Sequence, residues 1–387
     1  MRSYAFQSSA PQGSIFKLIG AYEGLRQGHS PLLVDGEGFD PKASAGKRQI
    51  VAYTPGGIPY QRIYKGGRLP KSSMSQIGKI DVLGALEHSS NPYFSVLAGD
   101  YLTDAEDLAH AARSFGYGEK SGLELPGEVA GNLPNDLKRN KTGLYSFAIG
   151  QHTLLNTPLQ SVLMMSAIAN GGKLLKPKIV KTVTGFTPDR KNLSAFAREN
   201  GFAEEELKAL GIPFSLFTGI EMKDLVKEII GQSIEVRKMI PLSPTIRSQL
   251  LEGMDHALWS NKGNARPGII RSLRSNPTLQ ADYLLLQHQM IGKTSTAEIL
   301  YNPNLNPSNI AQMYKHIWFG ALSFSPDHPI KVRYDYPELA IIVFSRFGDA
   351  GREGAPIAAQ LIKRWREIQK KHSSSIQVPG RYTIREK

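Results

Sequence analysis

The most regular helical pattern of hydrophobic residues lies near the N-terminus. Apolar residues recur at positions 15, 18, 19, 22 and 25, the spacing of one face of a helix. Pro11 and Gly13 come directly before this stripe, where such residues mark a helix start. The pattern predicts a helix with Ser14 at its N-terminus and Lys17 one turn further along on the same face.

The same reasoning predicts elements along most of the chain. Helices are expected over 81–116 with a break before Pro92, over 157–170, and over 355–369. Residues 280–300 and 316–347 alternate or run apolar, which predicts strands. Residues 26–80 are rich in Gly, Pro and Lys and are interpreted mostly as loops.

Composition narrows the class of protein only slightly. With 387 residues, 41% of them hydrophobic, the chain can bury a full core, and it contains no apolar run near the roughly 18 residues of a membrane span. The absence of cysteine excludes disulfides and thiolate metal sites. A net charge of +13 fits contact with an anionic envelope polymer or membrane surface, or simply a basic surface. No basic-aromatic nucleic-acid motif is present, so nucleic acid is not an expected partner.

Three short motifs in a fixed order carry the chemistry. They are Ser14-x-x-Lys17, then Ser89-x-Asn91, then Lys293-Thr294-x-Thr296. This series is the signature of active-site serine enzymes that react with D-Ala-D-Ala peptides and β-lactams. Acyl transfer to a serine needs a nearby base, an oxyanion pocket and a group that holds the substrate, and the three motifs supply such residues.

Two other segments match parts of the signature and have to be weighed against it. Ser44-x-x-Lys47 lies in a polar, turn-rich run without an apolar stripe, which favours a loop. Lys141-Thr142-Gly143 follows a charged segment without strand alternation, whereas Lys293 is flanked by apolar residues. We therefore expect Ser14 and Lys293, not Ser44 and Lys141, to belong to the site.

With these motifs the chain resembles the transpeptidase domain of penicillin-binding proteins, most closely the class B, monofunctional branch. Further stretches similar to that family follow in order: Ser121–Glu128, Ala148–Gln151, Thr157–Gln160, Ala169–Gly172, Gly253-Met254, Trp318–Gly320 and Gly354–Ala359. The resemblance implies an α+β fold, with a mainly antiparallel sheet flanked by helices and an α-rich lobe.

The resemblance also implies a peptidoglycan D,D-transpeptidase that cross-links stem peptides through an acyl-enzyme and needs no metal or organic cofactor. Its partners would be peptidoglycan stem peptides, β-lactams as inhibitors, and other cell-wall synthesis or division proteins. Its location would be the periplasmic face of the inner membrane. The alternatives are a D,D-carboxypeptidase or β-lactamase, in which water resolves the ester, and a non-catalytic β-lactam sensor or cell-wall scaffold.

By resemblance, five of the motif residues are catalytic, namely Ser14, Lys17, Ser89, Asn91 and Lys293, while Thr294, Ser295 and Thr296 bind the substrate. By resemblance, Ser14 is the nucleophile and Lys17 its base, because burial would favour the neutral amine. Ser89 would relay a proton between Lys17 and the leaving nitrogen. Asn91 would bind the substrate amide.

The third motif would hold the substrate. Lys293 supplies a positive field that also favours a neutral neighbouring amine, and Thr294 and Thr296 would bind the terminal carboxylate. By resemblance, the backbone N–H groups of Ser14 and Thr296 form the oxyanion hole. Ser295 occupies a position where the family has Gly, and we expect its added atoms to crowd the edge of the cleft.

The domain is expected to cover residues 1–369, with a charged insertion at about 187–245 and a mobile basic tail at 370–387. By resemblance, an N-terminal membrane anchor and a pedestal module would precede such a domain, and we expect both to be absent from this chain. His152 stands where the family has Gly, which is expected to distort that turn.

Overall fold

The computed structural model describes residues 2–29, 34–35, 48–53, 59–63, 77–179, 182–184, 229–231, 234–301 and 312–375. The chain divides into two compact units. The first consists of Met1–Leu175 with Val236–Lys387, and the second is Lys176–Glu235. In the second unit, β6 (Thr182–Thr184) pairs antiparallel with β7 (Ile229–Gly231).

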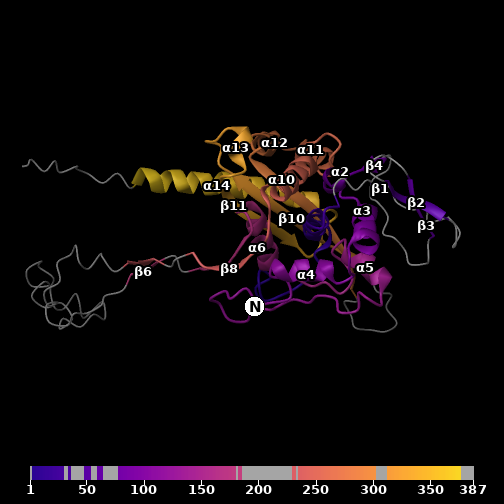
Figure 1. Cartoon of the computed structure of the whole chain (residues 1–387). Coiled ribbons are helices and arrows are strands. Elements are labelled where there is room, and N and C mark those ends of the chain that lie inside the picture. Colours follow the sequence, from indigo (N-terminus) through magenta and orange to yellow (C-terminus); the bar gives the residue numbers. More distant parts are fainter. Residues whose placement is uncertain are drawn as a thin grey trace, which may run out of the picture. The chain divides into compact units, whose positions relative to one another are not determined.

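A three-stranded antiparallel sheet forms the centre of the first unit (Figure 1). Its order is β11 (Pro337–Ser345), β10 (Gln312–Phe324), β9 (Met290–Tyr301). The strand prediction is therefore confirmed for most of its length. It is wrong for 280–289, since Pro277–Leu284 is a helix (α12) whose first turn is capped by the Asn276 side chain.

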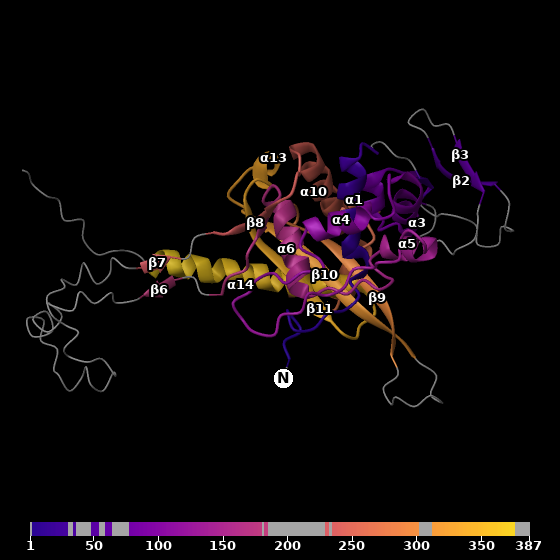
Figure 2. The same ribbon diagram turned by 60° about the horizontal axis from the view of Figure 1, so that its bottom comes forward.

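The two faces of this sheet pack against different helices. Met165 of α6 (Pro158–Ala169) contacts Gly320 of β10, whereas Gly354, at the start of α14 (Gly354–Ser375), contacts Phe319. Neighbouring strand residues point to opposite faces. Trp318 therefore belongs to one buried cluster and Phe319 to the other. Figure 1 shows β11 between α6 and α14, and Figure 2 shows the same elements from another direction.

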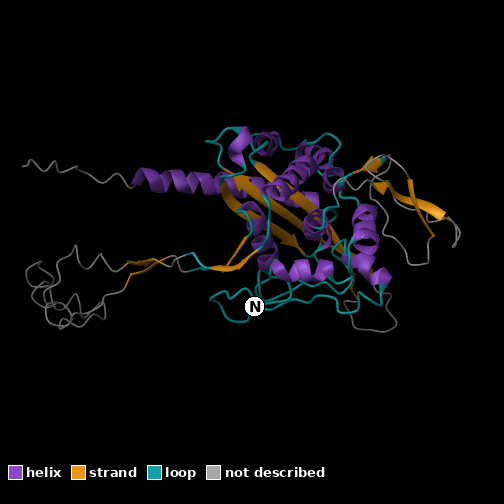
Figure 3. Cartoon of the chain, in the orientation of Figure 1, coloured by secondary structure: helices purple, strands orange, loops and turns teal. Residues whose placement is uncertain are grey.

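Helices form most of the rest of the first unit (Figure 3). They are η1 (Gly13–Phe16), α1 (Lys17–Arg26), α2 (Val82–Glu87), α3 (Asn91–Val96), η2 (Leu97–Tyr101), α4 (Asp107–Ser114), α5 (Lys141–Phe147), α10 (Pro244–Trp259), α11 (Arg266–Leu273), α13 (Ile330–Arg333) and η4 (Gly351–Glu353). The expected α+β class, an antiparallel sheet with helices around it, is confirmed.

The segment interpreted as loops contains four strands. In the region 26–80, β1 (Val34–Asp35) pairs with β4 (Lys79–Ile80), and β2 (Arg48–Tyr53) pairs with β3 (Pro59–Ile63). The prediction of loops relied on the Gly, Pro and Lys content of the region. It overlooked the short run at Arg48–Tyr53, which contains β-branched and aromatic residues that favour strands. Ser44 and Lys47 lie outside the described residues.

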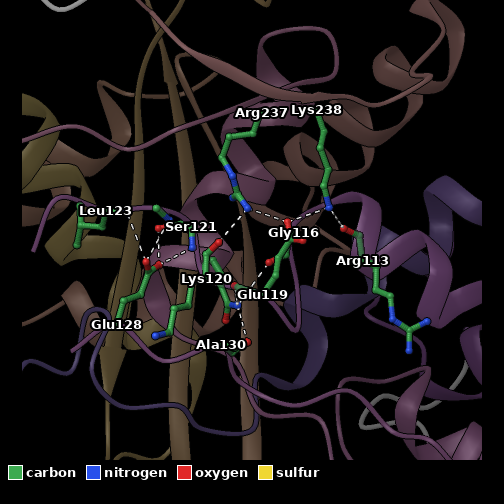
Figure 4. A network of polar contacts seen from close by, with 12 residues as sticks. Arg113, Gly116, Glu119, Lys120, Ser121, Leu123, Glu128, Ala130, Arg237 and Lys238 are labelled. Atoms are coloured by element: carbon green, nitrogen blue, oxygen red, sulfur yellow. Dashed lines mark hydrogen bonds and ion pairs between the residues drawn. The ribbon is translucent and has the colours of Figure 1, made fainter. Parts of the chain in front are cut away.

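A short strand pair is formed by the segments that precede and follow the second unit in the sequence. β5 (Lys173–Leu175) pairs with β8 (Val236–Met239), and both strands belong to the first unit. Arg237 Nη2 and Lys238 Nζ each lie 2.8 Å from Glu119 Oε1. Figure 4 shows these residues. The last part of the segment predicted as an insertion, from Val236 onward, is thus part of the larger unit.

Two other expectations about the chain's organisation concern residues that are described only in part. Most of 187–245 lies outside the described residues, so its place relative to the cleft stays a prediction. Helix α14 continues to Ser375 and so includes the first residues of the expected basic tail, while 376–387 lie outside the description.

Candidate active site

The turn before Ser14 is held by hydrogen bonds to two distant segments of the chain. Gly13 has φ = +68°, a conformation that favours glycine, and its N–H donates to Gly150 O at 2.8 Å. Trp318 Nε1 donates to Pro11 O at 2.9 Å. Ser14 therefore lies in η1, directly before α1, and not in the first turn of the α-helix itself.

Lys17 begins α1 and is completely buried. Its Nζ lies 2.6 Å from Ser89 O, 2.6 Å from Asn91 Oδ1 and 3.3 Å from Ser89 Oγ. Burial lowers the pKa of Lys17 well below its usual value, and the charge of Lys293 lowers it further. A neutral amine has two N–H groups and one lone pair. The two acceptors at 2.6 Å can use both N–H groups, which leaves the lone pair for a proton.

Ser89 occupies a tight turn between α2 and α3. Its φ is +53°, in the left-handed region that non-glycine residues seldom adopt. Ser90, and not Ser89, caps α3 by accepting from Tyr93 N at 3.3 Å. Ser89 is therefore not the residue that caps α3. Its hydroxyl faces the two buried lysines instead.

Lys293 of β9 contacts the same hydroxyl. It is completely buried, and its Nζ donates to Ser89 Oγ at 2.7 Å and to Thr294 O at 3.0 Å. Burial lowers the pKa of Lys293 to about 7. Among the described residues, no carboxylate pairs with Lys17 or Lys293. Both amines therefore remain easy to deprotonate.

The hydroxyls of the two threonines lie on the other side of β9. Thr294 Oγ1 lies 3.2 Å from Asn264 Nδ2, and Thr296 Oγ1 accepts from Gly351 N at 3.1 Å. Thr294 is 9% exposed. Asn264, in the loop between α10 and α11, belongs to no motif, and the sequence analysis missed it.

Ser295 corrects an expectation about the cleft. Its side chain is only 2% exposed, and its Oγ donates to Gln12 O at 2.5 Å. A Cβ on Gly13 would lie 2.5 Å from this Oγ, so the serine packs against the backbone just before Ser14. The added atoms do not crowd the edge of the cleft, because β9 directs them toward the Ser14 turn.

Two features noted in the sequence have local structural roles. His152 adopts φ = +64°, as the glycine it replaces could, and its Nε2 lies 2.8 Å from Asp136 Oδ1. The buried Glu128 accepts from the backbone N–H groups of Ser121 and Gly122 at 2.7 and 3.1 Å (Figure 4). Glu128 therefore stabilises its own loop, since its oxygens are used by local donors.

The structure thus brings together Lys17, Ser89, Asn91 and Lys293 beside the turn that carries Ser14. Two buried amines with lowered pKa values share one serine hydroxyl, an arrangement able to move a proton between neighbouring groups. In the described part of the chain, no three His, Cys, Asp or Glu side chains gather as metal ligands would.

A family model decides which family this geometry represents. Residues 58–326 match the penicillin binding protein transpeptidase domain. The chain belongs to this family. The matched region includes Ser89, Asn91 and the Lys293 strand but begins after Ser14 and Lys17, so those two assignments depend on the contacts described above.

Curated relatives agree with the family but match only in part. Penicillin-binding protein H of Bacillus subtilis is 33% identical over 154 residues, which is 35% of this chain and 22% of that protein. The peptidoglycan D,D-transpeptidase MrdA of Salmonella typhimurium is 31% identical over 125 residues, 29% of this chain and 20% of that protein. The matched segments thus span about a fifth of these relatives.

Solved structures of penicillin-binding proteins share the fold over nearly the whole chain. Penicillin-binding protein 2B of Streptococcus pneumoniae superposes with a TM-score of 0.58 at 18% identity, covering 98% of this chain and 49% of that one. PBP2 of Pseudomonas aeruginosa gives 0.55 at 18% identity, covering 94% and 62%. Within the described residues, no helix is both long and apolar enough to span a bilayer.

Proposed function

We propose that this chain is the catalytic part of a peptidoglycan D,D-transpeptidase that works through a Ser14 acyl-enzyme. The observation that supports it most is the buried chain of contacts from Lys17 through Ser89 to Lys293 beside the Ser14 turn. These contacts would allow a proton to leave the Ser14 hydroxyl as Ser14 attacks the substrate.

In the first half of the reaction, Ser14 Oγ attacks the carbonyl carbon of the penultimate D-Ala. The hydroxyl proton passes to the neutral Nζ of Lys17. Ser89 then delivers its hydroxyl proton to the nitrogen of the terminal D-Ala as the C–N bond breaks, and it takes in exchange the proton held by Lys17. The products are an ester on Ser14 and free D-Ala. The N–H groups of Ser14 and Thr296 would hold the oxyanion between these steps.

In the second half, the amine of a neighbouring stem peptide attacks the ester carbonyl. The amine loses one proton to the Lys17–Ser89 pair, and Ser14 regains a proton as its C–O bond breaks. A β-lactam would acylate Ser14 in the same way. Its leaving nitrogen remains tethered to the acyl group by the opened ring, which explains how it inhibits.

Transfer to an amine is favoured over hydrolysis by what surrounds the site. A β-lactamase or D,D-carboxypeptidase needs a group that activates water. The described residues bring no carboxylate into contact with Lys17, Ser89 or Lys293. Glu128, buried in the same unit, is occupied by its own loop.

Product analysis with a D-Ala-D-Ala peptide and an acceptor amine tests this proposal. We expect release of one D-Ala together with the cross-linked product, and a slowly decaying adduct with penicillin. Free tetrapeptide as the main product would make the chain a carboxypeptidase, and steady penicillin hydrolysis would make it a β-lactamase. Acylation by penicillin without any peptide product would indicate a sensor or scaffold.

The expected setting of the enzyme follows from its relatives. One solved neighbour is a complex between PBP2 and MreC from Helicobacter pylori, with a TM-score of 0.56 at 18% identity. We propose that this chain likewise works with other cell-wall synthesis or division proteins, at the periplasmic face of the inner membrane. Co-purification of the full-length protein with envelope partners, and fractionation of cells, would test both points.

A further inference from the structure

A short loop between α10 and α11 contacts the third motif at Thr294. The loop contains Gly263, whose Cα leaves no room for a Cβ, which would lie 2.5 Å from His256 O. Arg266 Nη1 fixes the loop from within by donating to Trp259 O at 2.7 Å and to Asn261 Oδ1 at 2.9 Å. The loop backbone is therefore held against the end of α10.

Asn264 projects from this loop and contacts two parts of the site. Its backbone N–H donates to Glu87 O at 3.1 Å, at the end of α2 and two residues before Ser89. Its side-chain Nδ2 lies 3.2 Å from Thr294 Oγ1, with Oδ1 slightly further away at 3.5 Å. One residue thus connects the Ser89 turn with the Lys293-Thr294 strand.

The polarity of this contact matters for binding an anion. A hydroxyl has one proton to donate and two lone pairs that accept. When Asn264 Nδ2 donates to Thr294 Oγ1, the single proton of Thr294 is left for a ligand carboxylate. The acceptor Asn264 Oδ1 is the more distant of the two atoms, at 3.5 Å. If both polar atoms of side chain 264 were acceptors, as in Asp, the proton of Thr294 would turn toward them and away from the ligand.

We propose that Asn264 is a positioning residue that orients the Thr294 hydroxyl to donate to the terminal carboxylate of the substrate or of a β-lactam. The inference rests on the proposed function, because it assumes that Thr294 holds that carboxylate. Asn264 itself does not touch the reacting bond. Its loss therefore weakens binding of the carboxylate and leaves the chemical step on Ser14 nearly unchanged.

Asn264→Asp provides the sharpest test, since it replaces the donor by an acceptor and adds a negative charge. Acylation is measured with a penicillin that has its free carboxylate and with the methyl ester of the same penicillin, separating the binding constant from the rate constant of acylation. We expect the Asp variant to weaken binding of the carboxylate form by roughly 10- to 100-fold, the range for a lost hydrogen bond to a charged group. Binding of the ester changes little.

Two further variants sharpen the result. Asn264→Ala removes the donor without adding charge, and its effect should have the same direction and be smaller. Asn261→Asp makes the same chemical change in the same loop, at an exposed residue that contacts Arg266 rather than Thr294, and it should keep the wild-type preference for the carboxylate. Acylation by the ester also reports that each variant is folded.

Three outcomes would overturn the proposal. An unchanged carboxylate-to-ester ratio in Asn264→Asp, or an equal fall for both compounds in the rate constant of acylation, would show that Asn264 does not act on the carboxylate. An equal loss in Asn261→Asp would reduce the effect to general charge repulsion. If the wild-type protein is not labelled by either compound, the proposed function itself fails, which is a separate result.

Discussion

Two parts of this chain carry nearly the same three residues and differ in everything around them. Lys141-Thr142-Gly143 begins helix α5, with a lysine side chain that is 45% exposed and lies 3.0 Å from Asp100. Lys293-Thr294-Ser295 lies in strand β9, with a completely buried lysine that contacts Ser89. Lys141 is thus partly exposed and engaged in an ion pair with the buried carboxylate of Asp100. A buried lysine with a lowered pKa beside a serine can take part in chemistry.

The comparison shows that surroundings, more than the motif letters, determine the reactive segment. The literal Lys-Thr-Gly of α5 matches the family pattern better than Lys-Thr-Ser of β9. Only the second is fixed in a strand whose side chains point alternately to the Ser14 turn and to the α10–α11 loop.

Replacing each lysine by alanine should give the largest difference between the two segments in the rate of acylation. Lys293→Ala should slow acylation of the protein by penicillin by about 10²–10³-fold, the range for losing one electrostatic group from a preorganised site. The Lys141→Ala protein should be acylated at the wild-type rate, because the Lys141 amine is paired with Asp100, whereas the Lys293 amine contacts Ser89. Stopped-flow measurement of both variants gives the answer, and equal rates in the two would contradict it.

Lys17→Ala should have the next largest effect. Without the buried amine, no group takes the proton of Ser14, and the acylation rate constant should fall by at least about 10²-fold. Circular dichroism and thermal melting serve as controls for folding. A folded Lys17→Ala protein with a near-normal rate would show that another group is the base.

The sequence alone predicted the parts of the site that depend on local pattern. The apolar stripe after Pro11 placed Ser14 and Lys17 together, and apolar flanks distinguished Lys293 from Lys141. It could not predict the direction of the Ser295 side chain or the role of Asn264, since both depend on contacts between distant segments.

Errors in the fold have a similar cause. The run of three leucines that ends at Leu286 looks the same for a strand and a buried helix, and the Asn276-Pro277 start of α12 is the signal that separates them. In the region 26–80, the many turn residues led to a prediction of loops although β2 is a six-residue strand. Its pairing with β3 joins two segments of the chain, and the sequence pattern of either segment alone does not reveal it.

The two lysines should also differ in how they contribute to the pH dependence of the free energy of unfolding. The pKa of Lys293 is about 7 when folded and returns to about 10.5 on unfolding. Between these values the unfolded chain binds more protons, so the free energy of unfolding should rise with pH, by at most about 1.4 kcal/mol per pH unit from this group. Urea unfolding from pH 7 to 10 should show this component lost in Lys293→Met and kept in Lys141→Met. The same slope in all three proteins would mean that Lys293 is not buried.

Ser295→Gly should have the smallest effect. It restores the family's residue and removes the hydrogen bond to Gln12 O, which should lower the free energy of unfolding by about 1 kcal/mol. The Ser14 turn should then be less firmly held, and no second residue should become labelled. If Ser295→Gly abolished acylation, the Ser295 hydroxyl would have to take part in the reaction.

The central claim is that Ser14 is the residue that becomes acylated. Peptide mapping by mass spectrometry after incubation with penicillin tests it directly, in the wild type, Ser14→Ala and Ser44→Ala. The account predicts one adduct, on the peptide that contains Ser14, absent in Ser14→Ala and unchanged in Ser44→Ala. An adduct that persists in Ser14→Ala, or that maps to the Ser44 peptide, would contradict it.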